Sequence, residues 1–400
     1  MSVIFYFWIA LGLSITVVWL RRHGDISRAV HRASMLTPDL FLDAAPASPR
    51  VSVVVAARNE ESNIERCIRS LVDQDYPDLQ IIAVNDRSED RTGAILAELQ
   101  RSSPQRLNVV TVTETRPGWH GKVNAVHTGM ASADGAYLVF TDADCVQRSN
   151  RSITVALRYA VEHDIEFLSV IPVVAPACIW EAIVQPVAAG VLMFWNPPER
   201  VNDPRRPEAY ANGAFMLLER RAYERIGGHE AVRDALCEDM QLARIAKAAG
   251  VRLHVVQNRG LYETRMYETL RETWRGWSRI LQGSLERPAR VMLAAVVLSI
   301  ISLGPWASLI GLGVAGGAAG AVGSSWGVPL AVWTLAAGAQ LSVMFRFYPL
   351  VSAPPRRALT YPLGALALLA ILLDAWLKLL GLGATVWSGR SYGTPANGAR

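Results

Sequence analysis

Two aspartates close an apolar segment in the middle of the chain, in the stretch Tyr137–Asp144. Carboxylates at positions i and i+2 of an extended segment point to the same side. Two like charges held together are unfavourable unless a cation neutralises them, and hard oxygen ligands suit Mg²⁺ or Mn²⁺. The spacing therefore predicts a metal site at Asp142 and Asp144, where the ion would neutralise a leaving diphosphate.

A second acidic pair, Glu238 and Asp239, opens a predicted amphipathic helix that runs to about Ala249. One interpretation is that the two carboxylates complement the dipole of their own helix. The other is catalytic, because a positioned carboxylate can act as a general base and take the proton of an acceptor hydroxyl. We predict Asp239 as that base, with Glu238 as its neighbour.

Polar residues also follow the first two predicted strands. Arg58, Asn59 and Glu60 are placed to hold a base or a ribose. Alternatively, Asn59 caps the next helix and Glu60 complements its dipole. Asp86 is placed to accept hydrogen bonds from a ribose hydroxyl or a base imino group, or it belongs to a polar turn that caps a helix.

The stretch Gly118–Lys122 has two glycines, which allow a close approach of backbone to ligand. Lys122 then lies at a predicted helix start and suits a phosphate oxygen. The stretch lacks the spacing of a P-loop, and its alternative interpretation is an ordinary turn with a surface lysine.

Further candidates are predicted near the acceptor. Asn212 and Gly213 fall in a small-residue segment, Ala211–Met216, which reads as a strand lining a site. His229 follows two glycines, a pattern typical of a loop that can close, although a lone histidine there is more often an ordinary loop residue. Trp277 and Arg279 lie on a helix that leads to an apolar region. They either face the acceptor or form an interfacial aromatic and basic belt.

Alternating strands and helices position these residues. Continuous apolar runs predict strands, and helical spacing predicts the segments between them. The strands are expected at Val51–Ala57, Leu79–Val84, Leu107–Val112 and Ala136–Thr141, with helices at 61–74, 90–100 and 122–130. This order predicts an α/β fold with a mostly parallel sheet, whose ligands bind at the carboxyl ends of the strands.

Apolar segments flank this region. Hydrophobic residues make up 51% of the chain and charged residues 19%, and the mean hydropathy is +0.20. Val3–Leu20 is long enough to cross a bilayer and is followed by Arg21 and Arg22. Because a cleaved signal peptide carries its positive charge before the apolar run, we predict an uncleaved anchor with these arginines in the cytoplasm.

Three more spans are predicted after the polar region, near Val291–Gly313, Val328–Tyr348 and Leu359–Leu380. The first is glycine-rich and reads as one long tilted helix or two short ones. Asp374 and Lys378 fall inside the last span, four residues apart, and read as an intrahelical pair or as part of a path for a lipid acceptor. The predicted division is an anchor (1–22), a linker (23–49), a catalytic domain (50–285), a membrane region (286–390) and a tail (391–400).

Charge and cysteine content exclude other classes. The 40 basic and 35 acidic residues give a net charge of +5. No basic run is interleaved with aromatic residues, which argues against a nucleic-acid partner, and the charge suits anionic lipid headgroups. The four cysteines have no metal-ligand spacing, which argues against a zinc site and a disulfide framework.

Seven motifs occur in order between Arg50 and Leu285: VSVVVAARNEE, VNDRSEDRT, GWHGKVNA, FTDADC, NGAF, GGHE and EDMQLA. In this ordered set the chain resembles family 2 glycosyltransferases of the GT-A fold. The combination of GWHGK, NGAF and GGHE is similar to membrane-bound subgroups that glycosylate lipids. Ceramide glucosyltransferase-like, carotenoid-type and hopanoid-associated enzymes are such subgroups.

The resemblance implies a donor of the UDP- or GDP-sugar type, a lipid acceptor and Mg²⁺ or Mn²⁺. Asp86 and the Arg58–Glu60 stretch would hold the nucleoside, with Lys122 near the donor. Asp142 and Asp144 would hold the metal, the donor diphosphate and the ribose. Asp239 would be the base for single-displacement attack with inversion. The implied location is the cell membrane, with several spans and a cytoplasmic catalytic domain.

One motif departs from the family pattern. Processive synthases and ceramide glucosyltransferases carry [QR]-x-x-R-W, whereas this chain reads RETWRGWSR. Trp277 and Arg279 are the candidates to replace it. The departure argues against a processive synthase, and an oligosaccharide or polysaccharide synthase of the same fold is the alternative function. A non-catalytic membrane protein would have no reason to keep Asp142, Asp144, Lys122 and Asp239 together.

Overall fold

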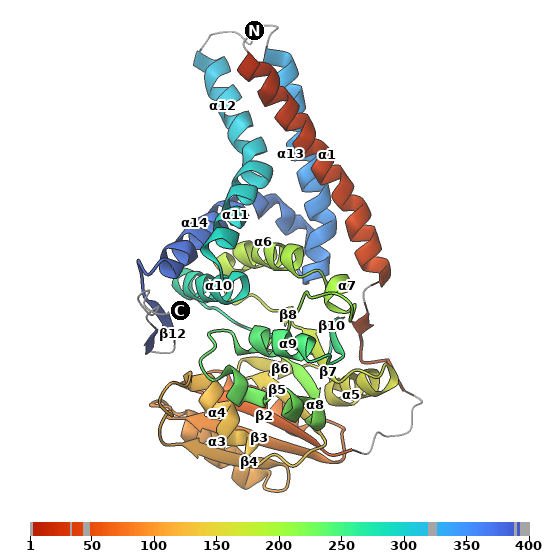
Figure 1. Ribbon diagram of the computed structural model, residues 1–400, viewed down its shortest axis with the longest axis vertical. Coiled ribbons are helices and arrows are strands. Elements are labelled where there is room, and N and C mark those ends of the chain that lie inside the picture. The colour runs from red at the N-terminus through yellow and green to blue at the C-terminus, as the bar shows by residue number, and fades with distance from the viewer. Residues whose placement is uncertain (1–2, 33, 43–48, 319–325, 388–389, 393–400) are drawn as a thin grey trace. The chain divides into compact units, whose positions relative to one another are not determined.

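The computed structural model describes residues 3–32, 34–42, 49–318, 326–387 and 390–392. They divide into two compact units (Figure 1). The sheet unit comprises Ala33–Ala175 and Met193–Met266. The helical unit comprises Met1–Arg32, Pro176–Leu192 and Tyr267–Arg400.

The sheet unit is built on an eight-stranded sheet in the order β1-β10-β7-β9-β5-β2-β3-β4. All neighbours are parallel except β9, which is antiparallel to both β5 and β7. A second sheet has the order β6-β11-β8. The strands are β1 (Met35–Leu36), β2 (Val51–Ala57), β3 (Leu79–Asp86), β4 (Leu107–Val112), β5 (Tyr137–Asp142), β6 (Cys145–Gln147), β7 (Phe167–Ile171), β8 (Val173–Val174), β9 (Met216–Glu219), β10 (Leu253–Asn258) and β11 (Tyr262–Thr264).

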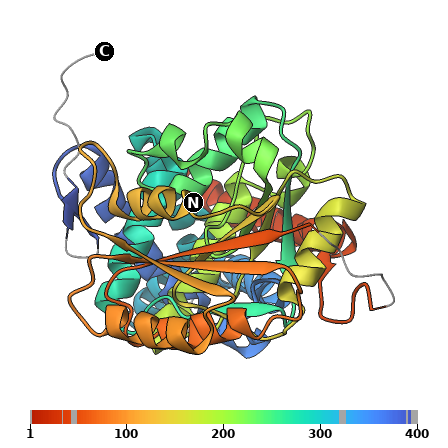
Figure 2. The same ribbon diagram turned by 90° about the horizontal axis from the view of Figure 1, so that it is seen from below.

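Helices cover both faces of the large sheet, as seen from below in Figure 2. Val53 and Val55 pack on one face, with α2 (Ile64–Val72), α3 (Thr92–Ser102) and α5 (Ser152–Glu162). Val54 packs on the other face, with α4 (Gly121–Met130), α8 (Arg220–Arg225) and α9 (Glu238–Ala248). Burial on both faces explains the continuous apolar run of β2. The predicted α/β class with a mostly parallel sheet is confirmed.

One predicted strand is a turn. The segment Ala211–Phe215 is not a strand, and β9 begins only at Met216. The side-chain oxygen of Asn212 accepts a hydrogen bond from the Ala214 N–H at 2.9 Å. This local bond folds the chain into a turn, because an asparagine side chain can replace a backbone acceptor.

Four helical stretches of the helical unit are long and apolar enough to cross a membrane: Val3–Val30, Pro288–Ala315, Gly327–Val351 and Pro355–Leu379. This confirms the prediction of one N-terminal and three C-terminal candidate spans. The helices are α1 (Val3–Arg32), α6 (Ile179–Trp195, shared with the sheet unit), α10 (Leu270–Leu285), α11 (Pro288–Val297), α12 (Gly304–Ala318), α13 (Gly327–Phe347) and α14 (Tyr361–Leu379).

The glycine-rich region is one long helix rather than two short ones, as far as Ala318. A π-helical stretch, Leu298–Leu303, joins α11 to α12 without a break. The glycine-rich residues 319–325 lie outside the described residues.

Helix α1 continues well beyond its apolar run. Arg22 pairs with Asp25 at 2.9 Å, and Arg28 also pairs with Asp25. These contacts between residues three apart extend the helix through the segment that the sequence assigns to a linker. Residues 43–48 of that linker are outside the described part of the chain.

Helix α6 joins the helical unit although its sequence lies within the predicted catalytic domain. It contacts α14 closely at Gly364, where an added Cβ atom would lie 2.5 Å from the carbonyl oxygen of Ile183. Glycine is therefore needed at Gly364 for the two helix backbones to approach. The sequence did not predict this helix, because Glu181 and Pro186 interrupt its apolar run.

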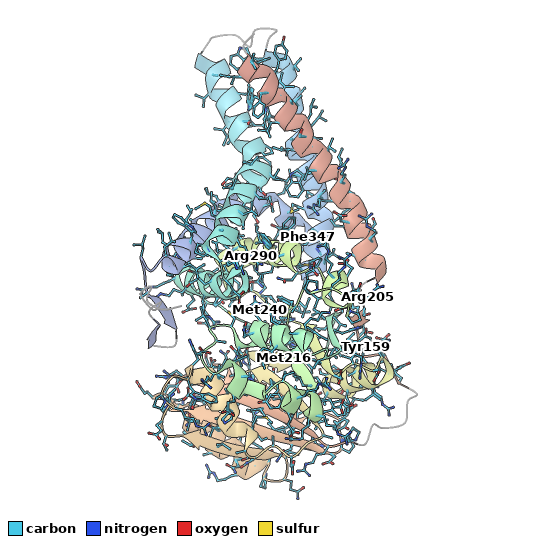
Figure 3. The ribbon with its side chains drawn as sticks, viewed as in Figure 1. Tyr159, Arg205, Met216, Met240, Arg290 and Phe347 are labelled. Carbon is cyan, nitrogen blue, oxygen red and sulfur yellow. The ribbon has the colours of Figure 1, made fainter. Side chains whose placement is uncertain are left out.

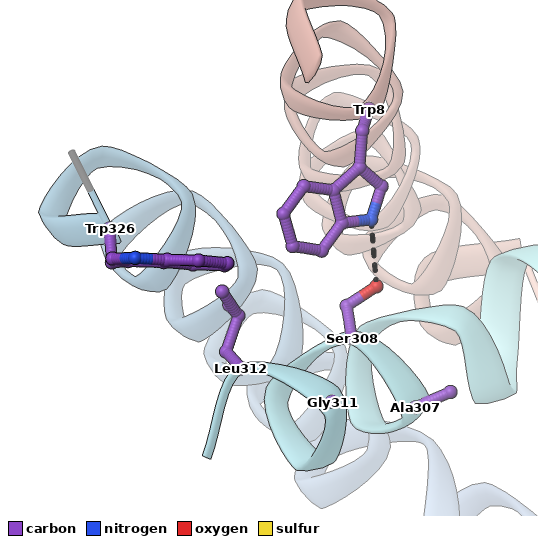
Figure 4. A pocket seen from close by; sticks show the side chains of 6 residues that line it. All are labelled: Trp8, Ala307, Ser308, Gly311, Leu312 and Trp326. Atoms are coloured by element: carbon purple, nitrogen blue, oxygen red, sulfur yellow. Dashed lines mark hydrogen bonds between the residues drawn. The ribbon is translucent and has the colours of Figure 1, made fainter. Parts of the chain in front are cut away.

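A cavity of about 430 Å³ lies among the helices of the helical unit (Figure 4). Two of its lining residues are joined by a hydrogen bond, which the indole N–H of Trp8 donates to the Ser308 hydroxyl at 3.2 Å. The lining consists of Trp8, Ala307, Ser308, Gly311, Leu312 and Trp326. This lining is mostly apolar and holds none of the acidic residues predicted for chemistry.

Candidate active site

Two matching turns follow strands β2 and β3. These strands pair in register, with Ala57 opposite Asn85. Asn59 follows Ala57 by two residues, and Arg87 follows Asn85 by two residues. Both have positive φ angles, 56° for Asn59 and 52° for Arg87. Non-glycine residues with such φ angles are uncommon and often mark functional sites.

Hydrogen bonds join the two turns to each other. The backbone N–H of Asn59 donates to the Ser88 hydroxyl at 3.1 Å, and the Glu89 N–H donates to the Asn59 side-chain oxygen at 2.9 Å. The Glu60 N–H donates to the Thr92 hydroxyl at 2.8 Å. Asn59 therefore links the two turns and does not cap α2, whose N-cap residue is Asn63.

Asp86 and Arg58 complete the polar groups at these strand ends. Asp86 is buried and forms an ion pair with Arg87. The Nε atom of Arg58 is buried and has no hydrogen-bond partner within the described residues. A buried donor without a partner is costly, so Arg58 is a site at which a ligand acceptor atom would be favoured.

The aspartates Asp142 and Asp144 lie at the end of β5 and in the turn before β6. Burial, together with the charges of Asp142 and Glu60, raises the pKa of Asp144 to about 7. The ammonium group of Lys122 lies 2.6 Å from Asp142 Oδ1. These carboxylates therefore repel one another, and a lysine is already paired with one of them.

Lys122 also pairs with Glu238, again at 2.6 Å. It lies at the start of α4, whereas Glu238 begins α9. Both helices pack on the same face of the sheet. Lys122 therefore joins the predicted metal ligands to the predicted catalytic pair, a contact that the sequence did not predict.

Asp239 is oriented by two backbone donors. The Gly213 N–H donates to Asp239 Oδ2 at 2.8 Å, and the N–H of Met240 (labelled in Figure 3) donates to Asp239 Oδ1 at 2.7 Å. Burial and the adjacent charge of Glu238 raise the pKa of Asp239 to about 6, although Lys122 and the two hydrogen bonds act against this. A carboxylate with this pKa is ionised at neutral pH and basic enough to accept a proton.

The turn before β9 is placed beside these groups. The hydroxyl of Thr141 in β5 donates to the Ala214 carbonyl oxygen at 2.7 Å. An added Cβ atom at Gly213 would lie 3.3 Å from Asp239 Oδ2 and 3.5 Å from Lys122 Nζ. The structure therefore brings Gly213, Lys122 and Asp239 together.

The donor set fits a divalent cation that is held jointly with a substrate. Within the described residues, no group of three or more His, Cys, Asp or Glu side chains could hold a metal by itself. Mg²⁺ in proteins is usually bound by one or two carboxylates together with substrate phosphates. Asp142 and Asp144 match that pattern, and the lysine ammonium beside Asp142 shows that this position favours a cation.

Residues 52–227 match the model of glycosyl transferase family 2. The chain carries a family 2 glycosyltransferase domain. The match spans strand β2 to the start of the GGHE motif and includes Asp86, Lys122, Asp142 and Asp144. The protein is therefore a glycosyltransferase enzyme.

Relatives agree with this family. The chain is 25% identical over 264 residues to a 4,4'-diaponeurosporenoate glycosyltransferase of Staphylococcus aureus (strain USA300), which covers 66% of this chain and 68% of the relative. The structure resembles a mannosyltransferase of Pyrobaculum calidifontis solved with GDP-Man and Mn²⁺. The TM-score is 0.53 at 19% identity, over 93% of this chain and 99% of that one. This likeness confirms the GT-A fold of the glycosyltransferase.

His229 has a packing role in the glycosyltransferase domain. It is 1% exposed, and its Nδ1 atom lies 2.9 Å from the Tyr223 hydroxyl. Its ring also packs against Phe140, with the centroids 4.7 Å apart. Burial lowers the pKa of His229 to about 3, so it is neutral at physiological pH. These contacts give no support to His229 as an exposed residue of a closing loop.

Trp277 and Arg279 belong to the helical unit, on α10. Trp277 is 3% exposed and donates its indole N–H to the Gln185 side chain in α6 at 3.1 Å. Arg279 is half-buried. Burial of the Trp277 ring shows that it anchors α10 to α6 rather than lying in an exposed interfacial belt.

Proposed function

We propose that this glycosyltransferase moves a sugar from a nucleotide-sugar donor to a hydroxyl group of a lipid or other membrane-associated acceptor, with inversion. The observation that carries the proposal is the cluster around Lys122. This cluster brings the carboxylates of Asp142 and Asp144 together with the acidic pair of Glu238 and Asp239. A donor-binding pair and a base in one cluster suit single displacement.

The chain's own groups would perform the following steps. The turns after β2 and β3, with Arg58 and Asp86, would bind the nucleoside. Asp142 and Asp144 would hold a Mg²⁺ or Mn²⁺ ion, which would neutralise the leaving diphosphate. Asp239 would take the proton of the acceptor hydroxyl, whose oxygen attacks the anomeric carbon as the bond to diphosphate breaks. Attack opposite the leaving group inverts that carbon.

The acceptor class is supported by two independent features. The relative from Staphylococcus aureus is named for 4,4'-diaponeurosporenoate, a carotenoid-type acceptor. This chain also has four helical stretches able to cross a membrane. A membrane-resident, largely apolar acceptor explains why a sugar transferase would carry such helices.

Basic residues support a cytoplasmic location of the sheet unit. Trp8 packs on Trp333, and Arg346 donates to His23 at 2.9 Å, so α1 and α13 run side by side in the same direction. The C-terminal ends of both helices therefore lie on the same side and carry basic residues: Arg22 and Arg28 on α1, and Arg346 on α13. Positive residues mark the cytoplasmic side of membrane helices, and the sheet unit follows that end of α1 in the chain.

The test uses purified full-length protein in lipid nanodiscs. UDP- and GDP-sugars are screened for release of nucleoside diphosphate with Mn²⁺ or Mg²⁺, first without and then with extracted membrane lipids. The sugar linkage of the product is then read by NMR. We expect one donor class to be used only with a divalent ion, and the product to have the inverted linkage.

Two variants separate the roles within this reaction. Asp239→Asn should lower turnover by about 100-fold or more while leaving donor binding in place, because a general base contributes about 10²–10⁴-fold. Asp144→Asn should weaken binding of Mn²⁺ with the donor. The matched control is Asp164→Asn, a change at a side chain that is 82% exposed and pairs with Arg252. Full transfer activity in Asp239→Asn, or a retained linkage, would refute the mechanism.

A further inference from the structure

The ammonium group of Lys122 occupies a central place among carboxylates. It lies 2.6 Å from both Asp142 and Glu238, and its side chain is 35% exposed. Glu238 is nearly buried, with 7% of its side chain exposed. Asp144 and Asp239 add negative charge close by. Lys122 is thus the cation that makes this acidic cluster tolerable in the protein without ligand.

Its charge is secure in this setting. Two carboxylates, those of Asp142 and Glu238, lie 2.6 Å from the ammonium group of Lys122, and opposite charges at this distance favour the charged form of a lysine. A permanent cation at 2.6 Å from Asp142 repels any second cation that approaches the same carboxylate. Metal and lysine therefore compete for Asp142.

We propose that Lys122 is a resident counter-ion that withholds Asp142 from a divalent metal until the donor diphosphate arrives. This inference rests on the proposed function, since it assumes that Asp142 and Asp144 bind a metal with the donor. When diphosphate enters, its negative charge offers Lys122 a new partner, and Asp142 is released to the ion. Lys122 keeps its contact with Glu238 throughout.

The geometry also gives a consequence for the order of binding. Within the described residues the cluster lacks a third ligand that could compensate for a lost Asp142, because no larger ligand group is present. Metal alone therefore binds weakly, whereas metal and nucleotide bind cooperatively. By linkage, each tightens the other by the same factor.

The experiment measures Mn²⁺ binding by electron paramagnetic resonance of free Mn²⁺, with the full chain in nanodiscs. Mn²⁺ is titrated alone and in the presence of UDP or GDP. In the wild type we expect weak binding of Mn²⁺ alone and clear tightening by one of the nucleotides. Lys122→Met should tighten binding of Mn²⁺ alone by on the order of 10-fold and reduce the tightening by nucleotide, because a competing charge at short range is removed.

Two lysine variants serve as controls. Lys122→Arg keeps the charge and should behave like the wild type. Lys247→Met removes the same charge from α9, where Lys247 donates to the carbonyl oxygens of Val201 and Asp203, and should leave Mn²⁺ binding unchanged. Lys122→Gln replaces the methionine variant if the latter does not fold. Unchanged or weaker binding of Mn²⁺ alone in folded Lys122→Met or Lys122→Gln protein, or equal tightening in Lys247→Met, would overturn the inference.

Failure of the proposed function has a different signature. If the Asp144→Asn protein binds Mn²⁺ as tightly as the wild type does in the presence of either nucleotide, then the metal site itself is misassigned. If Asp144→Asn abolishes that binding while Lys122→Met and Lys122→Gln bind Mn²⁺ like the wild type, the metal site stands and only the role of Lys122 fails.

Discussion

At the scale of single residues, Asp239 is the group whose surroundings lead to a measurable pH dependence. Burial and the neighbouring Glu238 raise its pKa to about 6. A base must be ionised to act, and protons fill it as the pH falls through this value. With Mn²⁺ and donor saturating, so that the metal keeps Asp144 ionised, we therefore expect kcat/KM for the acceptor to be level above about pH 6 and to fall about tenfold per pH unit below it, as read from initial rates.

A variant of Glu238 tests whether Asp239 causes this fall in kcat/KM at low pH, which we call the acidic limb. Glu238→Gln removes a negative neighbour, so the pKa of Asp239 should fall and the limb should move to lower pH. Lys122→Met removes a positive neighbour and should move the limb to higher pH, because Lys122 lowers this pKa in the wild type. A limb that stays in place in both variants would show that another group titrates.

Gly213 gives a second prediction at this scale. An added methyl group would lie 3.3 Å from Asp239 Oδ2 and 3.5 Å from Lys122 Nζ, so both side chains must shift in Gly213→Ala. A displaced base lowers turnover steeply, and we expect a loss of about 10- to 100-fold in kcat. The thermal unfolding midpoint should change little. Wild-type turnover in a folded Gly213→Ala protein would show that this contact does not position the base.

At the scale of elements, the contact between α6 and α14 depends on one glycine. In Gly364→Ala the new methyl group would meet the Ile183 carbonyl oxygen at 2.5 Å and the Val187 side chain at 2.8 Å. Overpacking of this kind typically costs about 1–3 kcal/mol, so the unfolding midpoint in nanodiscs should fall. The matched control is Gly338→Ala in α13, where an added Cβ meets nothing within 4 Å and no loss is expected. Equal midpoints for both variants would contradict the contact.

A polar cluster joins α10 to α14. Lys378 Nζ lies 2.6 Å from Asp374 Oδ2 and 3.1 Å from the Ser278 hydroxyl, which itself donates to Asp374 at 2.5 Å. The predicted pair of Asp374 and Lys378 is thus present along α14, and it also binds a second helix. Its side chains are only 28% and 14% exposed.

This cluster predicts strong coupling between its charges. Asp374→Asn removes the carboxylate charge that lies 2.6 Å from the Lys378 ammonium in a poorly hydrated place, at a cost of about 1–3 kcal/mol. The double variant with Lys378→Met should cost less than the two single changes together. A double-mutant cycle of unfolding free energies in nanodiscs measures this difference, and additive values would show that the two charges do not interact.

At the scale of the whole molecule, the proposed orientation predicts which residues are accessible from outside the cell. Ile4 and Gly24 are exposed residues towards opposite ends of α1. An impermeant thiol reagent on intact cells should label Ile4→Cys and spare Gly24→Cys, because the basic end of α1 faces the cytoplasm. Both should react after the membrane is opened. The wild type, with its four native cysteines, gives the background, and labelling of Gly24→Cys in intact cells would reverse the orientation.

Much of the fold could be predicted because its signals are local in the chain. Buried strands such as β2 and β5 need a continuous apolar run, and that run ends where the strand ends. Membrane-spanning helices need about 20 apolar residues, a length that can be counted. The prediction of a strand at Ala211–Phe215 was wrong, because the side chain of Asn212 accepts a hydrogen bond from the Ala214 N–H and folds this strand-like sequence into a turn. Helix α6 was not predicted either, because its contacts with α10, α13 and α14 arise only when these helices pack together.

The sequence by itself determined which residue types are available for chemistry: Asp142 and Asp144 at a strand end, Lys122 at a helix start, and Asp239 in an acidic pair. Only the tertiary structure decided how they meet. Lys122 pairs with Asp142 and Glu238, and Gly213 orients Asp239. It also decided that His229 packs in the core. The reason is physical: side-chain type and spacing act within one element, whereas these contacts depend on how strands pair in register and how helices pack on the sheet.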